Sequence, residues 1–280
     1  MKIIRVFPRR TKATPTDELA VVGSPRFWDE ADEVHISVTF SWNLEEAERL
    51  AYQWERVAPV KIGGPATGMR GEEFEPGRYL ARGYTITSRG CPNHCWFCDV
   101  WKRDGDVREL PIRAGWNVLD DNLLATSKEH QRAVFEMLER QDCRVEFTGG
   151  LEAARFTEWH AERILRLKPK QVFFAFDEAS DWEPLVDAVE RVRAAWPAAI
   201  SGHRLRCYVL VGYPTDTMPK AESRLHSVIT LGVVPMAMLW RGRDGVVDPE
   251  WRRFQRLWAR PAVTVNQLNE RRQECLRTLN

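Results

Sequence analysis

Three cysteines, Cys91, Cys95 and Cys98, follow one another in the short segment GCPNHCWFC. This C-x3-C-x2-C spacing puts three thiolates on one polar loop, and each thiolate can bind one iron of a cubane iron–sulfur cluster. The fourth iron would lack a protein ligand and could bind a small molecule instead. Zinc prefers four ligands in a tetrahedron, and His94 lies too near the cysteines to complete one comfortably. An iron–sulfur cluster is therefore the preferred interpretation, ahead of zinc and of three structural thiols without metal.

The elements that would position this loop are predicted by apolar runs rich in β-branched residues. The expected strands are Tyr84–Ser88, Trp116–Asp120, Val145–Thr148, Val172–Phe176, Cys207–Val211 and Met236–Trp240. Neighbouring runs lie roughly 25 to 35 residues apart, the length of a βα unit with its crossover. Ser127, Thr157 and Asp181 indicate starts of the intervening helices. The spacing predicts six parallel βα units, which close about three quarters of a barrel.

Two smaller parts flank this region. In residues 1–80, an alternating run at 34–40, a capping pattern at Asn43 and Glu46, and a run at 60–62 predict a small lobe. We therefore expect an α/β fold with a partial (βα)6 TIM-like barrel. The expected divisions are a small N-terminal α/β lobe at 1–80, the barrel at 82–242 and a C-terminal helical extension at 243–280.

The C-terminal part contains a predicted amphipathic helix that opens at Asp248. Trp251, Phe254 and Trp258 form an apolar stripe along it, with arginines on the other faces. Arginines beside aromatic residues can bind nucleic acid through phosphate contacts and stacking. Acidic residues flank the helix, so a solvated arginine face is the favoured interpretation, and nucleic acid is not the favoured partner.

The composition limits the classes of protein. With 280 residues, 44% of them hydrophobic and 29% charged, the chain resembles a soluble globular protein. No apolar run approaches the ~20 residues that span a bilayer, and the N-terminal segment does not resemble a signal peptide. The net charge of +1 gives no overall attraction to nucleic acid. Because the cysteines indicate metal binding in a reducing compartment, we expect a cytoplasmic location and no membrane partner.

The cysteine spacing directly after a strand is the signature of the radical S-adenosylmethionine (radical SAM) superfamily, which the chain resembles over residues 82–240. Phe97, just before the last cysteine, also matches the family pattern. After the third strand, the segment TGGLE at 148–152 is similar to the family's Gly-Gly-Glu segment, whose backbone binds the methionine ammonium group. Leu151 stands where the family has its glutamate, and Glu152 comes one residue later. The alternative is a tight turn without a ligand.

Other strand ends extend the resemblance. In the family, polar groups after the fourth and fifth strands often bind the ribose, which implies such a contact from Asp177, Glu178 or a neighbour. The segment VGYPTDT at 211–217 resembles a turn of the cobalamin-dependent and methylthiotransferase branches. After the second strand, Asp121 and Asn122 could cap a helix or contact substrate, and the sequence leaves both open.

The N-terminal lobe resembles part of a domain that precedes the barrel in many family members. Its segments SVT at 37–39 and GGP at 63–65 are similar to the second half of a cobalamin-binding domain. The first half and the Asp-x-His-x-x-Gly motif are missing. We expect a shortened lobe that supports the barrel or shapes substrate access, without bound cobalamin.

The resemblance implies an enzyme with a [4Fe-4S] cluster and S-adenosylmethionine as cofactors. The metal ligands would be Cys91, Cys95 and Cys98, and the cofactor-binding residues would be Phe97, Gly149, Gly150, Glu152, Asp177 and Glu178. One electron from a flavodoxin- or ferredoxin-type reductant would cleave S-adenosylmethionine to a 5′-deoxyadenosyl radical. That radical would abstract hydrogen from a substrate that no motif identifies.

Two other classes of function remain open. One is a methyl- or methylthio-transferase acting on RNA or protein, which the lack of a second cluster motif disfavours. The other is a non-catalytic iron–sulfur scaffold protein. The remaining cysteines, Cys143, Cys207 and Cys275, are isolated in the sequence, and we predict that they are small buried hydrophobic residues.

Overall fold

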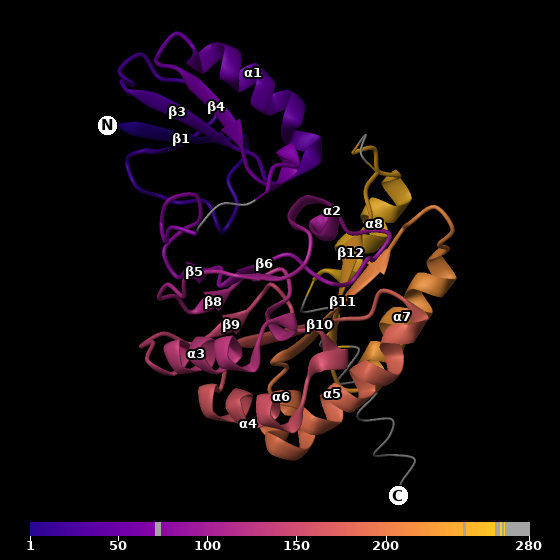
Figure 1. Ribbon diagram of the computed structural model, residues 1–280. Coiled ribbons are helices and arrows are strands. Elements are labelled where there is room, and N and C mark those ends of the chain that lie inside the picture. Colours follow the sequence, from indigo (N-terminus) through magenta and orange to yellow (C-terminus); the bar gives the residue numbers. More distant parts are fainter. Residues whose placement is uncertain (71–73, 243–244, 261–263, 265, 267–280) are drawn as a thin grey trace, which may run out of the picture.

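Two sheets of parallel strands organise the molecule, a small one near the N-terminus and a larger one after it (Figure 1). The computed structural model describes residues 1–70, 74–242, 245–260, 264 and 266. The fold is therefore mixed α/β, as expected. None of the helices in these described ranges is both long and apolar enough to cross a lipid bilayer.

The N-terminal lobe contains a four-stranded sheet in the order β2-β1-β3-β4, with every pair parallel. Its elements are β1 (Ile3–Phe7), β2 (Ala20–Val22), β3 (Glu33–Ser37), η1 (Ser41–Asn43), α1 (Leu44–Trp54), β4 (Val60–Gly63) and η2 (Pro65–Thr67). The predicted strands at 34–40 and 60–62 and the helix between them are confirmed, whereas β1 and β2 were not predicted. The capping box at Asn43 is wrong, because that side chain makes no hydrogen bond to the helix.

The larger sheet has six strands in the order β12-β11-β10-β9-β8-β5, all parallel. They are β5 (Tyr84–Thr85), β8 (Asn117–Val118), β9 (Glu146–Phe147), β10 (Gln171–Ala175), β11 (Leu205–Val211) and β12 (Val234–Leu239). All six predicted strands therefore form, the first three as short two-residue ladders. The spatial order follows the chain without reversal. β5 and β12 lie at opposite edges, and the described residues contain no closed barrel.

One part of the predicted first strand leaves the sheet. Residues Ser88–Arg89 form β6, which pairs antiparallel with β7 (Arg108–Glu109). The sequence predicted a single strand over Tyr84–Ser88, but only its first two residues pair with β8. This small hairpin encloses the cysteine segment and the short helix after it.

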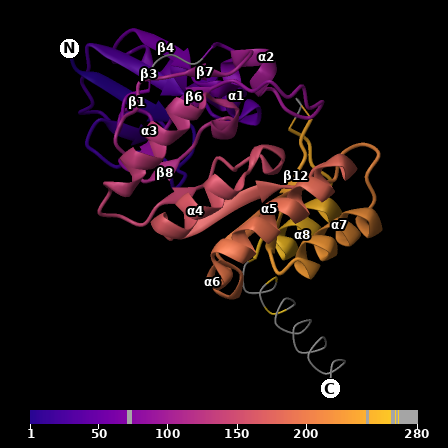
Figure 2. The ribbon, with the colours of Figure 1, turned by 60° about the horizontal axis from the view of Figure 1, so that its bottom comes forward.

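Helices follow the strands of the larger sheet and cover its core (Figure 2). They are α2 (Val100–Asp104), η3 (Leu123–Ala125), α3 (Lys128–Glu139), η4 (Ala153–Arg155), α4 (Glu158–Leu167), η5 (Ala179–Asp181), α5 (Trp182–Ala195), α6 (Pro197–Ser201), α7 (Met218–Thr230) and α8 (Pro249–Trp258). The predicted start of α3 is confirmed by Ser127, whose hydroxyl accepts from His130 N at 3.1 Å. Asp181 precedes α5 but makes no cap bond to it, because its carboxylate accepts from the backbone of Asp177 and Glu178.

Helix α8 packs against β12 and the larger core. Trp258 is buried, and Trp251 and Phe254 lie partly buried beside it. The predicted apolar stripe is therefore confirmed. Arg252 and Arg253 are exposed, as a solvated face requires.

Among the described residues, the lobe contacts the rest of the molecule at Ala81 and at Arg241. Ala81 N donates to Ala13 O at 2.8 Å. At the other place, the Arg241 guanidinium lies 4.3 Å from the centre of the Trp42 ring. Arg241 follows β12, so the lobe reaches the carboxyl edge of the larger sheet.

Candidate functional site

The cysteine loop is fastened at its base by the turn between α2 and β7. Cys91 N donates to Gly105 O at 3.0 Å. Gly90 has a φ of +86°, and a Cβ there would lie 2.3 Å from Asp106 O, so glycine is required at the entrance of the loop. Farther along the loop, Cys98 N donates to Cys95 O at 3.1 Å. The three thiols are partly buried and unoxidised.

A buried carboxylate holds the strand that leads into this loop. Asp120, which follows β8, accepts from Thr87 N and Thr87 Oγ1 at 2.6 Å each and from Ser88 Oγ at 2.8 Å. Burial raises the pKa of Asp120, and the hydrogen bonds from Thr87 and Ser88 oppose that rise. Asp120 therefore fixes the segment after β8 against the segment after β5.

Asp121 and Asn122, which follow Asp120, bind to the cysteine loop itself. Asp121 Oδ2 accepts from Gly90 N at 3.0 Å. Asn122 Nδ2 lies 3.3 Å from Cys91 Sγ and donates to Glu152 Oε2 at 2.7 Å. The Asn122 side chain makes no cap bond to η3, so of the two roles that the sequence left open, helix capping is excluded for it.

The Gly-Gly-Leu-Glu segment lies beside the same loop. A Cβ on Gly149 would lie 2.6 Å from Asp120 O, so the two backbones meet too closely for any side chain. Gly150 has a φ of +88°, a conformation that favours glycine. Leu151 is 3% exposed and belongs to the core, whereas Glu152 reaches the cysteine loop through Asn122. The Glu152 carboxylate, and not the side chain of Leu151, therefore faces the candidate site.

The amide of Asn122 is oriented by its neighbours. A carboxylate accepts hydrogen bonds only, so the NH2 group and not the carbonyl must face Glu152. The other atom, Asn122 Oδ1, is buried and has no hydrogen-bond partner in the described part of the chain. A buried acceptor without a donor is costly unless a ligand or water supplies one.

The two acidic residues after β10 have different roles. Asp177 Oδ1 accepts from Leu210 N at 2.9 Å, which joins β10 to β11. Burial raises the pKa of Asp177 to about 7; Asp181 and Glu178 add to the rise, and the Leu210 N–H opposes it. Glu178 Oε1 instead accepts from Trp96 Nε1 at 2.9 Å. The structure brings Glu178 to the cysteine loop and directs Asp177 to the β11 backbone.

An aromatic cluster that was not predicted from the sequence surrounds Trp96. The Trp96 ring centre lies 5.4 Å from that of Phe97, 5.5 Å from that of Tyr213 and 6.5 Å from that of Trp240. Tyr213 follows β11 and Trp240 follows β12, so three separate segments contribute. Trp96 remains 48% exposed, which leaves an aromatic surface beside the thiols.

The turn at 211–217 is held by its own side chains. Asp216 accepts from Gly212 N at 2.9 Å and pairs with Arg224 at 2.8 Å. These contacts explain the Gly and Asp of the pattern by local structure. The resemblance of this turn to the methylthiotransferase branch therefore gains no support from the contacts it makes.

The environment of two of the thiols, those of Cys95 and Cys98, favours their protonated form when no metal is bound. Burial raises the pKa of Cys95 to about 11, and the nearby cysteines and Glu178 add to the rise. Burial also raises the pKa of Cys98. Iron binding would therefore have to displace protons, as is usual for thiolate ligands.

Three thiols on one loop are donors of the kind that an iron–sulfur cluster uses. In the described ranges, no three side chains of His, Cys, Asp or Glu are arranged to hold one metal ion. A cubane does not need this, since each cysteine binds a different iron. Three thiols on one loop, an acceptor lacking a donor at Asn122 and the close backbone at Gly149 fit a cluster with a small ligand that carries N–H groups.

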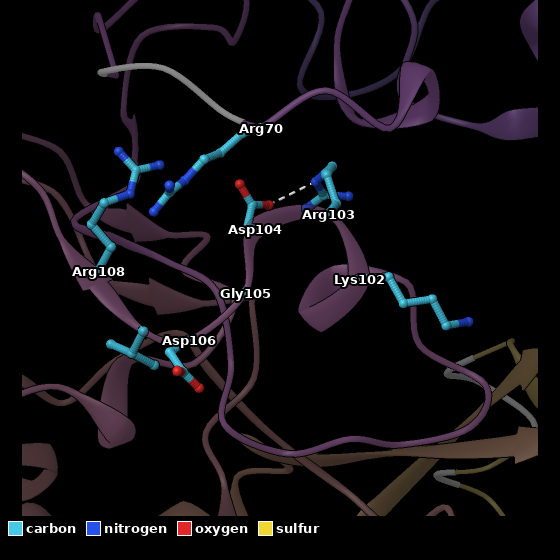
Figure 3. Close-up of a pocket in the computed structure, with 8 residues that line it drawn as sticks. Arg70, Lys102, Arg103, Asp104, Gly105, Asp106 and Arg108 are labelled. Carbon is cyan, nitrogen blue, oxygen red and sulfur yellow. Dashed lines mark hydrogen bonds and ion pairs between the residues drawn. The ribbon is translucent and has the colours of Figure 1, made fainter.

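A hollow of about 560 Å³ is lined by Arg70 and by the chain from α2 to β7 (Figure 3). Its charged lining consists of Arg70, Lys102, Arg103, Arg108, Asp104 and Asp106. Arg103 Nε and Asp104 Oδ2 form an ion pair at 2.7 Å. The described lining is net positive, and its Gly105 carbonyl is the acceptor for Cys91 N.

The other cysteines do not extend the thiol set. Cys207 is buried in β11, as predicted. The prediction for Cys143 is wrong, because this residue is exposed in the segment between α3 and β9, where the chain crosses the surface. Cys275 lies outside the described residues.

A scan of the sequence against protein-family models gives no match, and neither does a search among curated proteins. The functional assignment therefore depends on the residues of the site. Among the predicted residues, the structure joins Cys91 to Glu152 through Asn122 and connects the cysteine loop to Glu178 through Trp96.

Proposed function

We propose that this protein is a radical SAM enzyme. Cys91, Cys95 and Cys98 would hold a [4Fe-4S] cluster whose open iron binds S-adenosylmethionine. The observation that carries the proposal is the contact chain from Cys91 through Asn122 to Glu152. It joins the cysteine loop to the Gly-Gly-Leu-Glu turn, although the two segments belong to different βα units. Active sites of βα folds form at this carboxyl edge of the sheet.

The sheet order supports the finer part of the fold proposal. In a doubly wound sheet the strand order reverses at a switch point, whereas here each new strand joins beside the previous one. Such an order is that of a barrel built unit by unit. The proposal therefore includes a partial (βα)6 barrel of the radical SAM type over residues 82–242.

The residues of the site would bind and orient the cofactors. When bound, the cluster and S-adenosylmethionine supply a one-electron cleavage that yields methionine and a 5′-deoxyadenosyl radical. Gly149 and Gly150 let the backbone approach the amino-acid part of the ligand. The Asn122 carbonyl and the Glu152 carboxylate can accept from its ammonium group. Trp96 and its aromatic neighbours would exclude water from the reacting atoms.

The proposal also includes an electron donor of the flavodoxin or ferredoxin type. Such proteins are acidic, and the hollow at α2 and β7, whose described lining is net positive, is a surface of suitable charge. A cytoplasmic location belongs to the same proposal, because free thiols and a reduced cluster need a reducing compartment.

The test is anaerobic reconstitution with iron and sulfide, followed by S-adenosylmethionine and dithionite. We expect charge-transfer absorption of a cluster and formation of 5′-deoxyadenosine. Cys91→Ala, Cys95→Ala and Cys98→Ala should each abolish the product, while the matched control Cys143→Ala keeps it. Zinc in place of iron would reject the proposal. A stable cluster without 5′-deoxyadenosine would instead favour an iron–sulfur scaffold protein.

A further inference from the structure

Asn122 belongs to none of the motifs that carry the resemblance, yet its side chain touches both halves of the candidate site. It is 6% exposed, so its amide is almost fully removed from water. One N–H direction leads to Cys91 Sγ at 3.3 Å, and the other leads to Glu152 Oε2 at 2.7 Å. The distance to sulfur is suitable for an N–H···S hydrogen bond, since sulfur is a larger acceptor than oxygen.

The backbone around Asn122 makes this position rigid. The preceding residue, Asp121, is fixed by Gly90 N, and Asp120 is fixed by Thr87 and Ser88. Three consecutive side chains after β8 therefore bind successive parts of the segment that ends in Cys91. These hydrogen bonds hold the Asn122 amide beside the sulfur without any contribution from a metal.

We propose that Asn122 is the positioning residue of Cys91 and that its N–H···S bond raises the reduction potential of the cluster. This inference rests on the proposed function. Reduction adds negative charge to the cluster and its sulfurs, so a donor to a ligand sulfur stabilises the reduced form more than the oxidised form. The same NH2 group separates the sulfur from the Glu152 carboxylate, whose negative charge would otherwise oppose reduction.

The direct test is a redox titration of the reconstituted protein, followed by electron paramagnetic resonance. Asn122→Leu keeps the approximate size of the side chain and removes the donor. We expect its midpoint potential to shift to more negative values than in the wild type. Asn122→Gln retains an amide and should lie between the two. The matched control is Asn117→Leu, which changes a buried asparagine of β8 that accepts from Thr148 and has no hydrogen bond to a cysteine among the described residues.

The outcomes separate the inference from the proposed function. A wild-type potential in Asn122→Leu, with the cluster intact, overturns the inference and leaves the radical SAM proposal standing. An equal shift in Asn117→Leu also overturns it, because the effect would then be general. Wild-type protein that assembles no iron–sulfur cluster overturns both. If Asn122→Leu fails to fold, Asn122→Ala removes the donor without adding a charge and must show the negative shift.

Discussion

The two parallel sheets differ in how the loops at their carboxyl edges meet. In the N-terminal lobe the loops after β3 and β4 bond through backbone alone, Val38 N to Gly63 O at 2.8 Å and Ala66 N to Val38 O at 3.0 Å. In the larger sheet the corresponding loops meet through thiol, amide and carboxylate groups, and one buried amide oxygen, Asn122 Oδ1, lacks a donor. In the described residues each edge contains a buried polar atom without a partner, Trp42 Nε1 in the lobe and Asn122 Oδ1 in the larger sheet. The difference therefore lies in the thiol, amide and carboxylate groups that the loops of the larger sheet bring together.

Asp120→Ala tests this difference between the two sheets and should have the largest effect on stability. The change leaves buried donors on Thr87 and Ser88 without an acceptor, which costs about 3 to 5 kcal/mol of unfolding free energy. We also expect loss of iron binding, since the loop entrance is no longer held. Chemical denaturation and an iron assay check this. Full iron uptake with wild-type stability would show that Asp120 does not brace the loop.

A pair of glycine substitutions compares the two edges directly. A Cβ at either Gly64 or Gly149 would lie 2.6 Å from a backbone oxygen, that of Val38 or of Asp120. Each change to alanine should therefore destabilise the protein by about 2 to 3 kcal/mol. Only Gly149→Ala should also alter cluster assembly, because only there does the displaced backbone lead to the cysteines. An equal loss of iron in Gly64→Ala would break the comparison.

The next prediction concerns Asp177, a buried carboxyl group that follows β10. The folded-state pKa of Asp177 is raised to about 7 from an ordinary 3.8, chiefly by burial, so folding favours the protonated form. Its contribution to stability is fully present below about pH 4 and is lost as pH rises through about 7. Asp177→Asn keeps an acceptor for Leu210 N and does not ionise. The variant should gain stability over the wild type between pH 5 and pH 8 in urea denaturation, and an equal difference at both values would contradict this.

The smallest expected effect concerns the residues that precede α1 in the N-terminal lobe and α3 beside the larger sheet. Ser127 makes a cap bond to α3, whereas Asn43 makes none to α1. Ser127→Ala should lower the unfolding free energy by about 1 kcal/mol, and Asn43→Ala should lower it by a few tenths at most. Thermal unfolding of both variants measures the difference. Equal losses would mean that Asn43 caps its helix in solution.

Much of the larger sheet could be predicted because its strands are apolar runs at regular βα spacing. The two missed strands, β1 with five residues and β2 with three, have no helical pattern between them to signal a βα unit. The split of the first predicted strand into β5 and β6 depends on a long-range pairing with β7. Such a pairing leaves no local signal in the sequence.

The candidate site was predictable only where its residues follow a spacing rule. The cysteines and the glycine pair have such spacing, but which of Leu151 and Glu152 faces the site depends on the exit angle of the chain from β9. The Asn122 contacts join three separate segments, so no single stretch contains their signal. The aromatic cluster around Trp96 was missed for the same reason.

The hairpin of β6 and β7 holds the two ends of the cysteine segment together. Leu110 N donates to Thr87 O at 2.8 Å and Cys91 N to Gly105 O at 3.0 Å, so the chain leaves and returns at one point. The entropy of closing such a loop rises slowly with length, by roughly 0.6 kcal/mol for each doubling. Extra residues between Asp99 and Asp104 would therefore cost little closure entropy, but they would interrupt α2 and the bond from Trp101 Nε1 to Cys95 O at 3.0 Å, and so displace the sulfurs.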